Sequence, residues 1–107
     1  MNTNKKSKVA RLPNVHPGEV LREEFLKPLK LSQYRLANAL EIPESRISEI
    51  IHGARGITAD TALRFARYFG TSHELWLNLQ DRYDVEAAQR AKGREIGRIA
   101  RCELLAS

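Results

Sequence analysis

The stretch that decides the fold spans residues 31–57, with the sequence LSQYRLANALEIPESRISEIIHGARGI. Apolar residues recur at helical spacing in both of its halves, and in the second half Ile47, Ile50 and Ile51 would line one buried face. Pro43 separates the halves, because a proline disfavours helical geometry in the preceding residue and suits the first position of a new helix. The stretch is therefore typical of two short helices joined by a tight turn.

Capping residues and glycines mark the expected helix ends. Ser32 is the expected N-cap of the first helix of the motif, and Gly53 should end the second, which would run from residue 43 or 44 to 52. Thr58 and Ser72 are typical N-caps of two later helices, and Gly70 would close the first of these. The pattern predicts a chain of short helices.

Another helix precedes the motif. Pro17 is suited to its opening turn and Pro28 is expected to stop it, with an inner face formed by Val20, Leu21, Phe25 and Leu26. After the motif, the inward-facing residues are expected to be Leu63, Ala66 and Phe69.

A polar stripe lies opposite the isoleucines of the second motif helix. It consists of Ser45, Ser48, Glu49 and His52, with Arg46 at its flank. Short polar side chains suit a helix that enters the major groove, about 12 Å wide, and contacts base edges. Taken alone, the stripe fits a solvated helix face better.

Several segments together carry a resemblance to one family. They are HPGEVL (16–21), EEFL (23–26), SQ (32–33), LA (36–37), RISEIIHG (46–53), GIT (56–58), DTALRFA (60–66), FGTS (69–72) and WLNLQ (76–80). In them the chain resembles the HigA-type antitoxins of bacterial toxin–antitoxin modules, members of the phage-repressor-like helix-turn-helix group. The first and last segments are specific to that subgroup. The resemblance implies an all-α, compact five-helix, lambda-repressor-like domain, with a possible extra C-terminal helix.

The resemblance also implies contacts to the DNA backbone at the start of the first motif helix. Gln33 and Arg35 lie where such a helix crosses the phosphates, and Arg55 in the following loop should face them too. For Tyr34, DNA contact and packing on a neighbouring helix are about equally expected. Arg46 could contact either bases or backbone. Glu49 would have to accept from a cytosine amino group, since otherwise it is a surface acid that weakens non-specific binding.

The charge is unevenly distributed along the 107 residues. Residues 1–12 carry +4, residues 13–84 carry −1 and residues 85–107 carry +2, which gives the net charge of +5. We therefore expect a flexible basic arm (1–12), a helix-turn-helix domain (13–84) and a helical tail (85–107). The basic balance lies in the two ends, so the high isoelectric point by itself is weak evidence for a DNA-binding face.

The helix expected over residues 72–83 has more apolar surface than one small domain can cover. The surplus predicts a homodimer whose interface uses Leu75, Trp76, Leu77, Leu79 and Tyr83.

The sequence lacks the residue patterns that are usual in catalytic sites. His16, His52 and His73 have no metal-ligand spacing, Cys102 is the only cysteine, and no phosphate-binding glycine loop is present. We expect no enzyme activity, no cofactor and no metal. A cytoplasmic location is expected, because no run approaches the roughly 20 apolar residues of a membrane span.

The resemblance implies a sequence-specific DNA-binding antitoxin. Such a protein would repress its own operon by binding double-stranded operator DNA as a dimer, and would neutralise a small basic ribonuclease toxin. The alternative is a stand-alone helix-turn-helix repressor without a toxin partner. A toxin gene beside the gene for this chain would favour the antitoxin.

Overall fold

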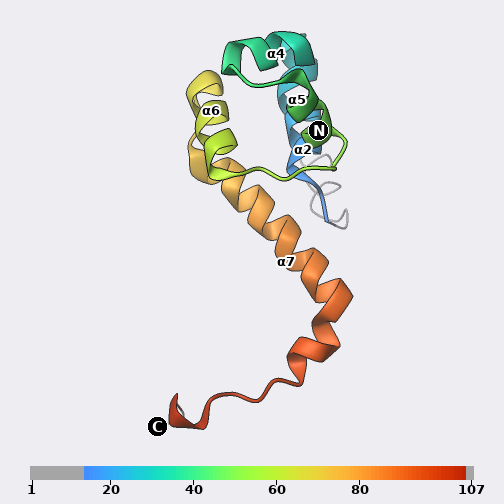
Figure 1. Cartoon of the computed structure of the whole chain (residues 1–107), viewed down its shortest axis with the longest axis vertical. Helices are drawn as coiled ribbons and strands as arrows, with labels where there is room; N and C mark the ends of the chain where they lie inside the picture. The colour runs from blue at the N-terminus through green and yellow to red at the C-terminus, as the bar shows by residue number, and fades with distance from the viewer. Residues whose placement is uncertain (1–13, 106–107) are drawn as a thin grey trace, which may run out of the picture.

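The computed structural model describes residues 14–105, and within this range the protein consists of helices and their connections (Figure 1). In chain order they are α2 (Pro17–Val20), η1 (Leu21–Leu26), α3 (Lys27–Leu29), α4 (Gln33–Leu40), α5 (Glu44–Ile51), α6 (Ala59–Phe69), α7 (His73–Gly97) and η2 (Glu103–Leu105). Since α2, η1 and α3 follow without a break, the expected five-helix, all-α architecture is confirmed. The basic arm expected over residues 1–12 lies outside the described residues.

The first helix continues past the residue that was expected to end it. Pro28 lies inside α3, and the helix ends where Lys30 takes a left-handed conformation with φ 52°. Proline cannot donate a backbone hydrogen bond and its ring crowds the preceding turn. The preceding turns are of the wider π type, with the Lys27 N–H donating to the Arg22 carbonyl five residues back. We infer that this widening accommodates Pro28 without breaking the helix.

The turn of the helix-turn-helix depends on Glu41 as well as on the proline. Glu41 adopts a left-handed conformation with φ 59°, and the Ile42 N–H closes the end of α4 by donating to the Ala37 carbonyl at 3.1 Å. Pro43 is the extended N-cap of α5, so the helix begins at Glu44, one of the two starts that were expected. The left-handed residue therefore reverses the chain, and the proline directs it into α5.

One apolar core joins all five helices. Its buried members are Leu21, Leu26, Leu36, Ala37, Leu40, Ile47, Ile50, Ile51, Ile57, Ala62, Phe65 and Trp76. The Trp76 ring lies 5.1 Å from the Phe25 ring and 4.9 Å from the Phe65 ring, and its Nε1 donates to Thr71 Oγ1 at 2.9 Å. Leu63 was expected to face inward but is 56% exposed. The buried face of α6 passes through Ala62 and Phe65 and turns Leu63 outward.

A close backbone approach fixes the first helix against α5. Pro17 and Gly18 are buried there, and a Cβ atom on Gly18 would stand 1.8 Å from the Ile50 carbonyl oxygen. No side chain fits in that space. Gly18 therefore sets the distance between the two helices.

Two polar side chains attach α7 to the rest of the domain. His16 caps the first helix, because its Nδ1 accepts from the Gly18 N–H at 2.9 Å, and its ring meets that of Tyr83 edge-on at 4.8 Å. Gln80 accepts from the Ile57 N–H at 2.7 Å through Oε1 and donates to Asp84 at 3.0 Å through Nε2. The end of the loop after α5 is thus held by α7.

The last helix is longer than the sequence suggested. It runs through Gly97 across the boundary expected at residue 84, with a kink at Lys92, whose φ of −136° is not helical. In Figure 1 its second half leaves the bundle and leads to the separate short helix η2. Within residues 14–105, no helix combines the length and the apolarity that a membrane span requires.

We predict that the Gly18→Ala variant loses about 3 kcal/mol or more of its unfolding free energy, because the added methyl group overlaps the Ile50 carbonyl. Urea denaturation measures this loss. Gly93→Ala is the matched control: it adds the same atom beside the kink of α7, where nothing lies within 4 Å, and should change the unfolding free energy by no more than about 1 kcal/mol. Equal effects of the two substitutions would contradict the close packing of Gly18 on the Ile50 carbonyl.

We also predict that stability falls as the pH drops below about 6.5. Burial lowers the pKa of His16 below its ordinary value of 6.5, against a smaller opposite effect of the Asp84 charge. The unfolded chain therefore takes up this proton at a higher pH than the folded chain, so the contribution of His16 is complete above 6.5 and is lost as the pH falls through the folded-state pKa. Unfolding free energies measured from pH 7.5 to 5 test this. His16→Asn keeps a capping oxygen that does not titrate, so the unfolding free energy of this variant should change less with pH. An unchanged dependence on pH would mean that a group other than His16 causes the effect.

Candidate nucleic-acid interface

The first turn of α4 presents three of the predicted contact residues. Ser32 caps the helix as expected, accepting from the Arg35 N–H at 3.0 Å, and this cap fixes the direction of the turn. Gln33 is half-buried and Arg35 is exposed. Tyr34 is 62% exposed, so little of it packs on a neighbouring helix, and its contact with DNA stays a prediction.

The outward face of α5 carries the predicted polar stripe. Ser45, Glu49 and His52 are exposed and Ser48 is half-buried, while the isoleucines on the other side lie in the core. Gly53 follows in a left-handed conformation with φ 77°, as expected for the residue that ends this helix. The helix therefore offers short polar groups to a partner while its apolar side holds it in place.

The geometry of His52 assigns the roles of its ring nitrogens. Its Nδ1 lies 2.7 Å from the Ser48 carbonyl oxygen, and 3.4 Å from Ser48 Oγ. A carbonyl only accepts, so Nδ1 must carry the hydrogen, which leaves Nε2 of the neutral ring as an acceptor. An acceptor there suits an amino group on a base edge, such as N6 of adenine or N4 of cytosine.

Arg46 is held by an acid of the next helix. Its Nη1 lies 3.6 Å from Asp60 Oδ2, and the same carboxylate accepts from Arg64 Nε at 3.0 Å. Arg64 also donates to the Leu40 carbonyl at 2.7 Å, at the end of α4. The network connects α4, α5 and α6, so Arg46 takes part in orienting α5, a role that its sequence position alone did not indicate.

Arg55 is also paired with an acid. Its Nε donates to Glu49 Oε1 at 2.7 Å, and the Glu49 carbonyl accepts from the Ala54 N–H at 2.8 Å. Both side chains of the ion pair remain about half exposed. Two of the three arginines among the predicted contacts thus have a carboxylate partner in the free protein.

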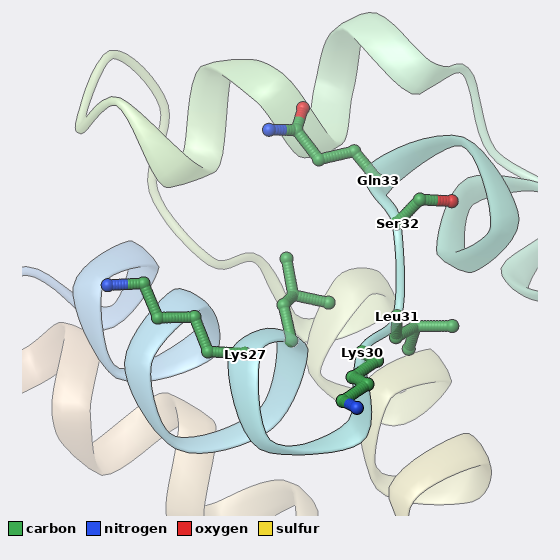
Figure 2. A pocket seen from close by; sticks show the side chains of 6 residues that line it. Lys27, Lys30, Leu31, Ser32 and Gln33 are labelled. Atoms are coloured by element: carbon green, nitrogen blue, oxygen red, sulfur yellow. The ribbon is translucent and has the colours of Figure 1, made fainter.

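A hollow beside the start of α4 is shown in Figure 2. It is lined by Leu26, Lys27, Lys30, Leu31, Ser32 and Gln33. In this view the amines of Lys27 and Lys30 and the Gln33 amide lie apart from one another around the hollow, so these polar groups do not converge on one point. Lys27 is engaged by Glu23, and its hydrogen bond is the main reason that the pKa of Glu23 lies below its usual value.

Lys30 is a further candidate contact residue, which the sequence patterns had not indicated. It is exposed and lines the same hollow as Gln33, immediately before the turn that was expected to cross a phosphate backbone. A lysine two residues before an N-cap serine was the available signal. The structure thus adds a cation to the α4 end of the candidate interface.

The predicted dimer residues differ in how accessible they are. Trp76 is fully buried in the core of its own chain, so its assignment to a dimer interface was wrong: the large ring fills the space between α7, α6 and the first helix. Leu75 is 38% exposed, and Leu77, Leu79 and Tyr83 are half-buried. Leu75 is therefore the most accessible of the five.

Among residues 14–105, no group of three or more histidine, cysteine, aspartate or glutamate side chains is arranged to hold a metal ion. The side chain of His16 is used to cap the first helix, and that of His52 bonds to its own helix.

Comparison with known proteins places this arrangement among DNA-binding regulators. The sequence profile of the helix-turn-helix family matches residues 23–76. Virulence-associated protein I of Dichelobacter nodosus is 56% identical over 81 residues, which are 76% of this chain and 75% of the relative.

Two solved structures share the fold and much of the sequence. An addiction module antidote protein of the HigA family from Coxiella burnetii superposes with a TM-score of 0.80 at 47% identity, covering 85% of this chain and 99% of the other. The antitoxin HigA of Pseudomonas aeruginosa, solved with the higBA promoter, has a TM-score of 0.79 at 42% identity, covering 81% and 96%.

Proposed function

Since this chain belongs to the helix-turn-helix family, in the group of HigA-type antitoxins, we propose that it represses its own operon by binding operator DNA as a dimer and that it neutralises a partner toxin. The outward face of α5 is the observation that carries the DNA-binding part. A helix with Ser45, Ser48, Glu49 and His52 on its exposed side can approach base edges without long side chains in the way. The similarity of this chain to an antitoxin solved with promoter DNA also supports the proposal that it binds DNA.

In this proposal the two motif helices have different tasks. The stripe on α5 contacts bases, whereas Gln33, Tyr34, Arg35 and the missed Lys30 contact the phosphate backbone around the start of α4. Operator DNA in bacteria lies in the cytoplasm, which is where the protein would act.

A dimer would give the complex its two-fold symmetry. The exposed side of α7 around Leu75, with Leu77, Leu79 and Tyr83 partly accessible beside it, offers the apolar surface. Two recognition helices related by a two-fold axis would enter successive major grooves about 34 Å apart.

The toxin part of the proposal rests on membership of the antitoxin group. The partner would be a small basic ribonuclease, encoded by the gene next to the gene for this chain. The alternative is a stand-alone repressor, and co-purification decides between them: an affinity-tagged chain, expressed with the product of the neighbouring gene, should retain that product. Loss of the product on washing at low salt, with operator binding intact, would favour the alternative.

We predict that the variants on α4 and α5 change DNA binding in different ways. Arg35→Ala should weaken binding to operator and scrambled DNA alike and lower the salt slope by about one unit, because it removes one phosphate contact. Ser48→Ala should instead change base preference, by about 1–3 kcal/mol at the contacted position. Fluorescence anisotropy over a salt series measures the salt slope and the base preference.

Footprinting of the chain's own promoter should show a palindrome. Protection of a non-symmetric site would count against the dimeric repressor.

We predict that Leu75→Glu converts a dimer into a monomer at tens of micromolar protein. A charge placed on an exposed apolar interface opposes association without entering the core. Sedimentation velocity gives the mass, and Leu63→Glu is the matched control, since Leu63 is even more exposed but lies on α6. If the unmodified chain sediments as a monomer, or if the two variants behave alike, the α7 interface is wrong.

A further inference from the structure

The pairing of Arg55 with Glu49 affects how the proposed interface discriminates between DNA sequences. Glu49 lies on the exposed face of α5, and Arg55 lies in the loop that follows the helix. Arg55 Nε donates to Glu49 Oε1 at 2.7 Å, and the N–H of the neighbouring Ala54 donates to the Glu49 carbonyl at 2.8 Å. The loop is therefore positioned so that its cation rests on the carboxylate of the reading helix.

This ion pair is exposed to any ligand that approaches α5. The two side chains are 48% and 46% exposed, so water and salt screen their attraction and a phosphate can replace the carboxylate. Replacement leaves Glu49 without its partner and close to the phosphates of the DNA, where a negative charge is repelled. Arg55 is consequently a poor phosphate ligand as long as Glu49 has no other partner.

A base edge can supply that partner. The amino group at N4 of cytosine donates in the major groove, and glutamate is a suitable acceptor for it. Where an operator places a cytosine opposite Glu49, the carboxylate moves to the base and Arg55 becomes free for a phosphate. Where guanine or thymine stands there, no amino group is offered in the major groove, and both groups stay paired with each other.

We infer that Glu49 is a specificity-determining residue that acts partly through Arg55, withholding this arginine from non-cognate DNA and releasing it at the operator. The inference rests on the proposed DNA-binding function and adds a residue pair and a mechanism to it. It makes the phosphate contact of Arg55 conditional on a base contact.

The test compares Glu49→Gln with Glu44→Gln. Both remove one negative charge from exposed positions of α5, but Glu44 lies in its first turn, away from the loop that carries Arg55. Binding of wild type and variants is measured by fluorescence anisotropy over a salt series. The probes are the duplex protected in the footprint of the chain's own promoter and a scrambled duplex of equal length.

Glu49→Gln should tighten binding to scrambled DNA severalfold more than Glu44→Gln does, and should raise the salt slope on that DNA by about one unit, because Arg55 is then free to contact a phosphate. The preference for the promoter duplex should fall about tenfold. In a chain that also carries Arg55→Gln, the effect of Glu49→Gln on scrambled DNA should disappear, which a merely structural role of Glu49 would not produce.

Two outcomes would overturn the inference, and only the second would also overturn the proposed DNA-binding function. If the wild-type chain prefers the promoter duplex but Glu49→Gln and Glu44→Gln behave alike, or Arg55→Gln does not alter the effect of Glu49→Gln, the coupling of the pair is wrong and the proposed function stands. If the wild-type chain binds both duplexes equally, the proposed function fails and takes the inference with it.

Discussion

The contact between the backbone at Gly18 and the carbonyl of Ile50 is the constraint on which the arrangement of the domain depends. It brings the start of the first helix against the end of α5 with no side chain between them. From that point His16 reaches the Tyr83 ring on α7, and the core closes around Trp76. The helix that would read DNA is thus held at its C-terminal end by backbone packing, and its outward face remains accessible to a ligand.

Charge at the candidate interface is more balanced than the net charge of +5 suggests. The chain carries +5 in total, but the domain between residues 13 and 84 is slightly acidic, and two of the three predicted contact arginines have carboxylate partners. Non-specific attraction to DNA grows with every cation that can release counterions. A face whose cations are partly engaged would bind weakly where it cannot also use its polar groups, and this favours reading sequence over mere charge.

Local patterns in the sequence predicted most of the fold. The isoleucine spacing in α5, the caps at Ser32, Thr58 and Ser72 and the left-handed Gly53 and Gly70 all follow from rules that act within a few residues. The left-handed conformations of Lys30 and Glu41 were not predictable in this way, because neither residue type requires them. For the site, periodicity placed the exposed stripe correctly, but the pairing of Arg46 with Asp60 joins positions on separate helices. Trp76 shows the same difficulty: helical spacing gives the direction of a side chain and not what the tertiary structure packs against it.

The bond from Ile57 to Gln80 joins the loop after α5 to the long final helix. A helix of 25 residues is stiff over the turns packed on the domain, and its far half extends beyond the bundle, up to and past the kink at Lys92. A force on the far end of α7 would tilt the helix about the turns that are packed on the domain, and Gln80 lies in those turns. Tilting of α7 would therefore strain or break the hydrogen bond between Ile57 and Gln80 at the end of the loop that carries Arg55, so that movement of the far half of α7 could be transmitted to the loop beside α5.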